Sequence, residues 1–494
     1  MYSQEYLKNQ RSETWREELR KSIKPKNRIE IPRVRMIEQP SDLRKKNFLE
    51  VNEGLTTEMA IEEAQRCLDC VNPTCISGCP VNINIPKFIK KIEAKDFLGA
   101  AEVLKDTNTL PAVCGRVCPQ EKQCEEKCFY TVSLKKEPVA IGYLERFAAD
   151  FERESGSVSI PAIAKNKGIK VAGIGSGPAT LAWAADMVKM GYDVTVFEAL
   201  HEIGGVLKYG IPEFRLPNSI IDFEIENLRK MGVKFVSNFV VGKTKDFEIL
   251  KKEGFVSFFI ASGAGLPNFM NIPGENSNNV LSSNEFLTRV NLMGAARTLE
   301  SDTPVSMGDN VAVIGGGNTA MDAVRTAKRL GAKRAMIVYR RSREEMPARV
   351  EEVQHAMEEG IEFLNLHNPT EYKADERGFV RKMILQKMVL GEPDASGRRK
   401  PIPTDDYVEI DVDVVIVAIG VSPNPLIPAV LNGLKMSKWS TIEVNERMQT
   451  SIEEFFAGGD IVRGGATVIL AMGDGRKAAA GMNEYLIEKG FVKN

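Results

Sequence analysis

The placement of cysteine constrains this chain more than any other feature. All eight cysteines of the 494 residues lie between Cys67 and Cys128. They form two runs, Cys67-x2-Cys70-x4-Cys75-x3-Cys79-Pro80 and Cys114-x3-Cys118-Pro119-x4-Cys124-x3-Cys128. Thiols that serve only as small buried hydrophobes would be scattered over the whole chain. Several thiols a few residues apart, in runs that each contain Cys-Pro, are typical of iron–sulfur cluster ligands.

Two other uses of such thiols have to be weighed. Disulfide frameworks suit small secreted domains, whereas this chain is large and its first ten residues, MYSQEYLKNQ, lack the apolar segment of a secretory leader. Structural zinc sites also use closely spaced thiolates, but they typically show two C-x2-C pairs. The x2/x4/x3 and x3/x5/x3 spacings do not fit that pattern. Iron–sulfur ligation is the favoured interpretation, and structural zinc remains the main alternative.

Size and composition exclude several classes of function. At 54.7 kDa the chain is long enough for about three domains. A formal charge of −1 leaves no basic surplus for nucleic acid, and no apolar run reaches the length of a membrane span. Three histidines in all argue against a His-rich metal site or a Ser-His-Asp triad. We expect a cytoplasmic protein that binds neither nucleic acid nor membrane.

The first 165 residues are rich in charge and in helix formers, with few strand signals. A capped helix is predicted to begin near Thr57 and to deliver Cys67 and Cys70 at its end. Apolar residues at helical spacing over residues 85–104 predict amphipathic helices between the two cysteine runs. After a polar linker at residues 155–167, apolar strand-like runs, glycine turns and helical segments alternate. That alternation is typical of doubly wound α/β domains.

A first glycine-rich turn follows the apolar run at residues 169–174. It reads Gly175-Ser176-Gly177-Pro178-Ala179-Thr180 and leads into a predicted helix, and the next strand, residues 193–197, ends at Glu198. This is a βαβ unit with an acid placed to bind a ribose hydroxyl. Small residues let the backbone approach a pyrophosphate, which the helix N-terminus then stabilises. We interpret this site as FAD-binding, and we expect Thr180, in place of the third glycine, to loosen the packing of helix on strand.

A second glycine-rich turn follows the strand at residues 310–314. It reads Gly315-Gly316-Gly317-Asn318-Thr319-Ala320 and fits G-x-G-x-x-A. The strand after it, residues 334–339, ends in Arg340-Arg341 rather than in an acid. Clustered arginines accommodate a 2′-phosphate, so this site is predicted to bind NADP(H). The alternatives are that the glycines only make tight turns and that the arginines begin a solvated helix.

At this point the chain resembles the small, or beta, subunit of bacterial NADPH-dependent glutamate synthase over essentially its full length. The resemblance also covers the large subunit of NADH-dependent ferredoxin:NADP oxidoreductase, sulfide-dehydrogenase-like proteins and the front half of dihydropyrimidine dehydrogenase. The segments that carry it are Cys114–Gln120, Gly175–Ala179, Glu202–Gly205, Gly210–Pro217, Gly315–Asp322 and Ala457–Asp460. It implies an α/β protein in which a helical domain with two [4Fe-4S] clusters precedes two Rossmann-like domains of the disulfide-reductase-like flavoprotein type.

The resemblance also implies particular ligands and contacts. One cluster takes Cys67, Cys70, Cys75 and Cys128; the other takes Cys79, Cys118, Cys124 and a non-cysteine ligand that aligns with Glu145. Cys114 is then spare. The alternative for Glu145 is an ordinary exposed helical glutamate. The further flavin contacts implied are Gly204, Gly205, Gly459, Asp460 and Thr467, the last at the start of a helix whose N-terminus faces the flavin.

Four segments are expected from these patterns. Residues 1–165 form the cluster domain, 166–285 and 421–494 the FAD-binding domain, and 286–420 an inserted NADP(H)-binding domain. No cysteine follows Cys128, which removes the dithiol step of a disulfide reductase, and we assign no catalytic acid or base.

Three functions were considered for such a chain. The first is an electron-input subunit that takes NADPH and delivers electrons to a glutamate synthase alpha subunit. The second replaces that acceptor by ferredoxin and a small flavoprotein subunit in a bifurcating complex. The third is a zinc-stapled nucleotide-binding scaffold without turnover. The sequence alone leaves the acceptor, the direction of electron flow, the cluster potentials and the oligomeric state open.

Overall fold

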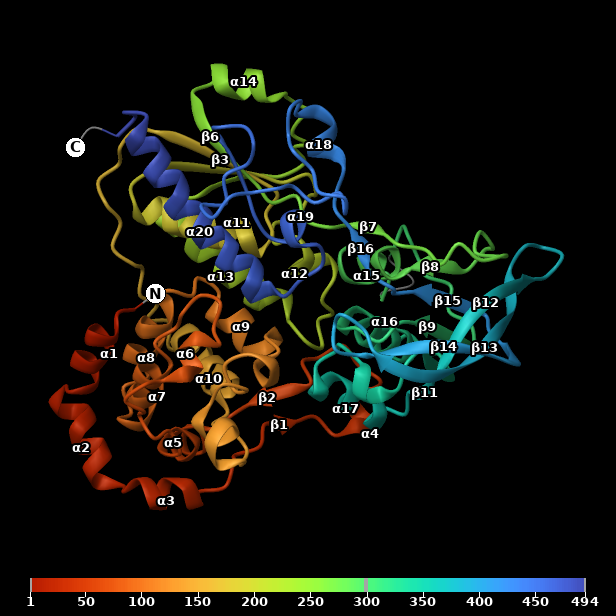
Figure 1. Cartoon of the computed structure of the whole chain (residues 1–494), viewed down its shortest axis with the longest axis horizontal. Coiled ribbons are helices and arrows are strands. Elements are labelled where there is room, and N and C mark those ends of the chain that lie inside the picture. The colour runs from red at the N-terminus through yellow and green to blue at the C-terminus, as the bar shows by residue number, and fades with distance from the viewer. Residues whose placement is uncertain (1, 297–300, 493–494) are drawn as a thin grey trace.

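The computed structural model describes residues 2–296 and 301–492. In Figure 1 a helical region formed by the N-terminal third lies below one α/β unit and beside a second. Its helices are α1 (Gln4–Arg11), α2 (Thr14–Ser22), α3 (Pro25–Glu30), α4 (Ser41–Arg44), α5 (Thr57–Gln65), α6 (Thr74–Ser77), α7 (Ile85–Glu93), α8 (Phe97–Lys105), α9 (Pro111–Val117) and α10 (Ile141–Ser155). A small antiparallel pair, β1 (Ile37–Glu38) and β2 (Asn52–Gly54), belongs to the same region.

The helices expected around the cysteines are present. Helix α5 is capped by Thr56, whose side chain accepts a hydrogen bond from the Met59 N–H, and it ends two residues before Cys67. Helices α7 and α8 lie between the two cysteine runs and bury apolar faces, including Phe88 and Leu104. Cys75 lies in the single-turn helix α6 and Cys114 in α9, and the other six cysteines lie in the loops and turns between helices. Such loops can wrap around an inorganic group that a straight helix could not enclose.

The first α/β unit is built on a five-stranded parallel sheet in the order β17-β6-β3-β4-β5. Its strands are β3 (Lys170–Ile174), β4 (Asp193–Phe197), β5 (Lys234–Val236), β6 (Phe255–Ile260) and β17 (Phe455–Ala457). Its helices are α11 (Pro178–Lys189), α12 (Val206–Tyr209), α13 (Asn218–Met231), α14 (Phe247–Lys252), α18 (Leu426–Val430), α19 (Asp460–Arg463) and α20 (Val468–Glu488). The central strands are buried, apolar runs, as expected when helices cover both faces of a parallel sheet.

The second unit has its own parallel sheet in the order β11-β10-β9-β15-β8. Its elements are β8 (Val280–Ser282), α15 (Ser283–Asn291), β9 (Asn310–Ile314), α16 (Asn318–Arg329), β10 (Arg334–Tyr339), α17 (Val350–Glu358), β11 (Glu362–Asn365) and β15 (Val414–Val417). An antiparallel three-stranded sheet, β12 (His367–Ala374), β13 (Val380–Pro393) and β14 (Arg399–Asp411), projects from it (Figure 1). The predicted α/β class with two doubly wound sheets is confirmed.

The chain passes from the first sheet to the second and back through a two-stranded ribbon. Its strands are β7 (Leu266–Pro267) and β16 (Val421–Ser422), which pair antiparallel. Strand β8 pairs with β15 of the second sheet, so the crossing precedes residue 286, where the sequence pattern had put the boundary. The sequence misplaced that boundary because β8 is only three residues long and carries no clear periodic pattern.

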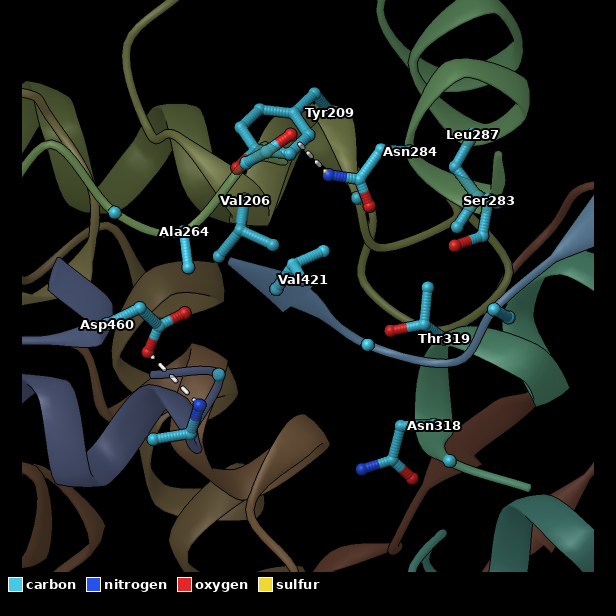
Figure 2. A pocket seen from close by; sticks show the side chains of 18 of the residues that line it. Val206, Tyr209, Ala264, Ser283, Asn284, Leu287, Asn318, Thr319, Val421 and Asp460 are labelled. Carbon is cyan, nitrogen blue, oxygen red and sulfur yellow. Dashed lines mark hydrogen bonds between the residues drawn. The ribbon is translucent and has the colours of Figure 1, made fainter. Parts of the chain in front are cut away.

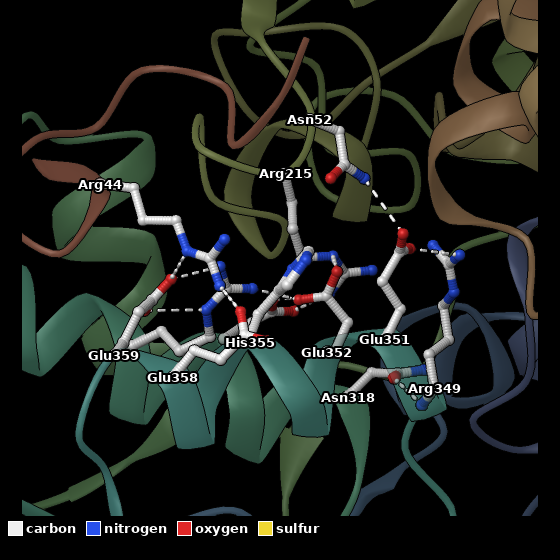
Figure 3. Close-up of polar contacts among 12 residues, drawn as sticks. Arg44, Asn52, Arg215, Asn318, Arg349, Glu351, Glu352, His355, Glu358 and Glu359 are labelled. Atoms are coloured by element: carbon white, nitrogen blue, oxygen red, sulfur yellow. Dashed lines mark hydrogen bonds and ion pairs between the residues drawn. The ribbon is translucent and has the colours of Figure 1, made fainter. Parts of the chain in front are cut away.

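An N-terminal arm, residues 31–54, reaches across to the second unit, which the sequence did not predict. Arg44 in α4 is buried and forms ion pairs with Glu358 and Glu359 at the end of α17. Three arginines, Arg44, Arg325 and Arg329, form ion pairs with the buried Glu359 carboxylate. Figure 3 shows Arg44 beside Glu359. Against the opposing effect of burial, Arg329 and Arg325 hold the pKa of Glu359 at about 2. The arm is therefore fixed to the second unit by the ion pair between Arg44 and the buried Glu359.

Thr180 was expected to loosen the packing of α11 on the neighbouring strand, but Gly173 of β3 leaves room for its side chain. Thr180 is fully buried, and a Cβ added at Gly173 in β3 would lie 2.6 Å from its Cγ2 atom. The small residue needed at this helix–strand contact is therefore on the strand instead of the helix. The expectation of loose packing was wrong.

We predict that Gly173→Ala lowers the free energy of unfolding by about 2 kcal/mol, because the added methyl overpacks this contact. Thr180→Ala alone should change little, since the Thr180 hydroxyl is buried without a hydrogen-bond partner. Combining the two changes should restore part of the lost stability, as measured by denaturant unfolding of the four proteins. If the changes in unfolding free energy of Gly173→Ala and Thr180→Ala simply added in the double variant, residues 173 and 180 would not be in contact.

Candidate functional site

One large cavity, of about 1380 Å³, lies at the carboxyl ends of both parallel sheets. The glycine turns after β3 and β9 both open into it, from opposite units. Figure 2 shows Tyr209 and Asp460 of the first unit and Asn318 and Thr319 of the second lining the same space. Ligands of open α/β sheets bind outside the carboxyl ends of the strands, so this cavity is the place for two nucleotides that must meet.

The first glycine turn has the geometry of a pyrophosphate cradle. Gly175 has φ +90°, and a Cβ added there would lie 2.6 Å from the Ala261 carbonyl oxygen. At Gly177, the residue before α11, an added Cβ would have no protein atom within 4 Å. Space of this kind beside a helix N-terminus suits a diphosphate, which is attracted by the unpaired N–H groups of the first turn.

Glu198 lies at the end of β4 and lines the cavity. Its carboxylate accepts hydrogen bonds from the Ser176 N–H at 2.8 Å and the Ser176 hydroxyl at 2.6 Å. The Ser176 hydroxyl accepts in turn from the Gly204 N–H at 2.9 Å. Gly204 therefore supports the turn through its hydrogen bond to Ser176 and does not line the cavity, whereas Gly205 lines it. Ser176, which sequence reasoning passed over, connects the predicted acid to the predicted glycines.

The C-terminal residues expected at the flavin lie on the same wall. Gly459, Asp460 and Thr467 all line the cavity. The Asp460 carboxylate accepts a hydrogen bond from the Ala466 N–H at 3.1 Å, and burial raises its pKa to about 6. Thr467 caps α20 by accepting from the Leu470 N–H at 3.3 Å. The N-terminus of α20, a helix of 21 residues, therefore opens toward the nucleotide space.

The second glycine turn repeats this arrangement in the other unit. Gly315 has φ +141°, and a Cβ added at Gly316 would lie 2.8 Å from the ring of Tyr339. At Gly317, the residue before α16, an added Cβ would again have no protein atom within 4 Å. The side-chain oxygen of Asn318 accepts a hydrogen bond from the Arg349 N–H at 2.8 Å, which fixes the loop after β10 against the turn. Thr319 lines the cavity, but Ala320 packs inside α16.

The two arginines after β10 have different surroundings. Arg340 is exposed and lines the cavity. Arg341 is buried; it pairs with Asp394 at 2.6 Å and donates a hydrogen bond to the Arg399 carbonyl at 2.8 Å. Arg341 therefore holds the projecting sheet against the loop after β10, whereas the Arg340 side chain can contact a ligand in the cavity. Sequence reasoning could not separate these roles, because Asp394 is more than fifty residues away.

Four thiols line one small apolar cavity in the helical region. They are Cys67, Cys70, Cys75 and Cys128. Burial raises the pKa of the Cys75 thiol well above its usual value, and the neighbouring Cys67, Cys128 and Cys70 add to this effect. Four cysteines from both runs therefore converge on one point.

A second group contains Cys79, Cys118, Cys124 and Glu145. All four are buried. Burial raises the pKa of Cys124 well above its usual value, and Glu125, Cys79, Glu145 and Cys118 lie near enough to raise it further. Glu145 in α10 accepts one hydrogen bond, from the Asn108 amide at 2.7 Å, and burial raises its pKa to about 8. It is not an exposed helical glutamate, and a buried carboxylate with so few partners fits a residue that contacts a metal group.

Cys114 is not among the thiols that line the small apolar cavity, and it lies beside the second group, with its thiol next to that of Cys118. It is fully buried, and its sulfur lies 3.6 Å from the Asn108 side-chain oxygen and 3.6 Å from the Met472 sulfur. Four thiolates around one zinc ion would sit about 3.8 Å from one another. In the part of the chain that the structure describes, the only three potential ligands within 4.8 Å of one another are Glu38, Glu351 and His355, none of them cysteine. The wider spacing of the thiols suits a group larger than a single ion.

The second thiol group touches the wall of the nucleotide cavity. A Cβ added at Gly473 of α20 would lie 3.1 Å from the carbonyl oxygen of Pro80, the residue after Cys79. Arg476, one turn further along α20, donates hydrogen bonds to the Val81 and Thr107 carbonyls. The helix whose N-terminus opens to the cavity is thus in direct contact with a cysteine-bearing loop.

A nucleotide cavity between two Rossmann-like units, in contact with a helical region that holds two groups of thiols, is the architecture of an iron–sulfur flavoprotein oxidoreductase. Residues 44–157 match the family model described as dihydropyrimidine dehydrogenase domain II, 4Fe-4S cluster. Residues 169–475 match the model described as pyridine nucleotide-disulphide oxidoreductase.

The relatives give the narrower family. The chain is 36% identical to the glutamate synthase [NADPH] small chain of Azospirillum brasilense, over 90% of this chain and 93% of that protein. It is also 36% identical to the corresponding small chain of Escherichia coli, over 93% and 98% of the two chains. The chain therefore belongs to the glutamate synthase small-chain, or beta-subunit, family. It is an NADPH-dependent oxidoreductase whose cofactors are FAD and [4Fe-4S] clusters, as the sequence analysis predicted, which removes the scaffold without turnover.

Other relatives and a solved structure complete the comparison. The NADP(+)-dependent formate dehydrogenase subunit beta of Moorella thermoacetica is 36% identical, over 84% of this chain and 60% of that protein. The structure of FprA from Mycobacterium tuberculosis matches 66% of this chain and 87% of its own with a TM-score of 0.56 at 19% identity, which supports the fold alone. Within the described residues, no helix is both long enough and apolar enough to cross a membrane.

Proposed function

We propose that the chain is an electron-input subunit: it binds NADPH and FAD in the cavity between its two α/β units and delivers electrons through its clusters to a larger partner, a glutamate synthase alpha subunit. Bound FAD would supply hydride-accepting chemistry and bound clusters would supply single-electron transfer. The observation that carries the proposal is the contact between α20 and the Cys79–Pro80 loop.

The geometry of the two thiol groups and of the nucleotide cavity supports the following assignment of residues to cofactors. We assign Cys67, Cys70, Cys75 and Cys128 to one cluster and Cys79, Cys118, Cys124 and Glu145 to the other. The turn at Gly175–Ala179, with Glu198, Gly205, Gly459, Asp460 and Thr467, would hold FAD, and Gly204 would support the turn. The turn at Gly315–Thr319, with Arg340, would hold NADPH, while Ala320 packs within α16 and Arg341 braces the site.

The domain division belongs to the same proposal. The cluster domain is residues 1–165, and the FAD domain comprises a first part that ends before β8 and a second part from residue 421. The NADP(H) domain is inserted between them, and the ribbon β7–β16 joins the two. A ribbon of two short strands is a suitable place for the small movements that nucleotide binding requires.

The proposed acceptor is tested by isolating the chain from its native host under anaerobic conditions. We expect it to copurify with a much larger subunit, and the complex to form glutamate from glutamine and 2-oxoglutarate when NADPH is added. Recovery with a small flavoprotein and ferredoxin reduction would instead support the bifurcating complex. In either case NADPH should bleach the flavin absorbance far faster than NADH; equal response to NADH would contradict the assignment of the arginine site.

A further inference from the structure

The tip of the projecting sheet reaches back to the nucleotide cavity. Strands β13 and β14 are joined by a tight turn in which the Gly397 N–H donates to the Asp394 carbonyl at 2.8 Å. Arg398, the residue after this turn, lines the cavity together with Arg340. The two residues are 58 positions apart in the sequence, and no local pattern connects them.

Three ion pairs hold this tip against the loop after β10. Arg341 of the loop pairs with Asp394 of the turn at 2.6 Å. Arg399 at the start of β14 pairs with both Glu344, at 2.9 Å, and Glu345 of the loop. In addition, Arg341 donates to the Arg399 carbonyl. The neighbours of Arg340 and Arg398 are therefore bonded to each other, which places these two arginines next to each other. Arg215 and Arg341 also line the cavity, but Arg215 is paired with Asp322 and Arg341 with Asp394.

Positive charge exceeds negative charge where the β13–β14 turn meets the loop after β10. Five arginines, at positions 340, 341, 343, 398 and 399, meet three carboxylates, Asp394, Glu344 and Glu345. The three carboxylates are engaged by Arg341 and Arg399. Among the described residues, Arg340 and Arg398 have no ion pair, and Arg398 makes one side-chain hydrogen bond, from Nε to the Ser396 hydroxyl at 2.9 Å. The terminal nitrogens of both arginines are left for an anionic ligand at the edge of the cavity.

We infer that Arg398 contributes with Arg340 to a two-arginine site for the 2′-phosphate of NADP(H), so that the β13–β14 hairpin is a specificity element of the nucleotide site. A planar guanidinium matches phosphate oxygens in a bidentate fashion, and two such groups complement a phosphate dianion. This inference rests on the proposed placement of NADPH at the Gly315–Thr319 turn. The buried Arg341 and the exposed Arg399 act only as positioning residues, because their charges are already neutralised.

The test compares the binding of NADP+ and NAD+ to the intact protein by isothermal titration calorimetry, for wild type and for Arg398→Gln. We expect Arg398→Gln to weaken NADP+ about tenfold, the effect of one lost charged hydrogen bond, and to leave NAD+ within about twofold. Arg398→Lys should recover part of the loss. The same change should weaken 2′,5′-ADP and leave 5′-AMP unaffected.

Arg377→Gln is the matched control, because Arg377 is an exposed arginine in the turn at the other end of β13 and does not line the cavity. It should change neither affinity. Unchanged NADP+ binding in Arg398→Gln would overturn the inference while leaving the proposed function intact, and so would equal losses for NADP+ and NAD+. Failure of wild-type protein to prefer NADP+ at all would instead count against the NADPH site itself.

Discussion

Cys128→Ala is expected to remove about half of the iron, about four of eight atoms per chain, because Cys128 is the one residue of the second cysteine run that joins Cys67, Cys70 and Cys75. The flavin should still be reduced by NADPH, since the nucleotide cavity lies in other parts of the chain. Electron delivery to a one-electron acceptor should be lost. The measurements are iron and acid-labile sulfide content, together with anaerobic reduction of flavin and of the external acceptor.

Cys114→Ala is the matched control for this prediction. Cys114 is buried, as Cys128 is, and its sulfur contacts Asn108, Met472 and the Cys118 thiol, but it does not line the cavity of Cys67, Cys70, Cys75 and Cys128. Its replacement should leave the iron content and both electron-transfer steps close to wild type. If both variants lost the same amount of iron, the loss would reflect disturbed folding and not a missing ligand. If only Cys114→Ala lost iron, Cys114 would be the ligand and Cys128 would not.

Gly177→Ala is expected to weaken FAD about 100-fold, which corresponds to the loss of about 3 kcal/mol of charge-assisted hydrogen bonds from the pyrophosphate to the turn. An added Cβ meets no protein atom within 4 Å, so the stability of the FAD-free protein should not change. Any loss of FAD from this variant would therefore reflect a clash between the added methyl group and FAD, and not a change in folding. FAD retention on gel filtration and thermal unfolding of the FAD-free protein are the two measurements.

Gly317→Ala provides the reciprocal case in the second unit, where the added Cβ also enters open space. It should weaken NADPH binding by a similar factor and leave FAD content unchanged. If Gly177→Ala lowered NADPH binding and Gly317→Ala released FAD, the assignment of the two nucleotides to the two turns would be reversed.

Much of the architecture could be predicted because its signals are local. Strands β4, β9 and β10 have the predicted bounds, since each is a short apolar run between turn residues. Both glycine turns lie where a strand passes into a helix, as their spacing indicated. The cysteine grouping, by contrast, came from the family resemblance. Spacing alone does not show that Cys128 lies with Cys67 and Cys79 with Cys118, because the folded loops decide which thiols meet.

The remaining features depend on contacts between distant parts of the chain. Burial of Glu145 requires α10 to pack against the cysteine loops, and its sequence neighbours do not reveal this. Thr180 looked unfavourable because its compensating residue, Gly173, belongs to the preceding strand. Arg340 and Arg341 are equivalent in sequence and differ only because Asp394 lies beside one of them. Side-chain roles of this kind are fixed by tertiary partners.

If this chain carries electrons from NADPH through one flavin and two clusters, wild-type protein purified without oxygen must contain all three groups. We expect the purified protein to be brown, to hold about eight iron, about eight sulfide and one FAD per chain, and to be partly bleached by NADPH. A colourless protein, or one that holds zinc in place of iron and sulfide, would contradict this expectation.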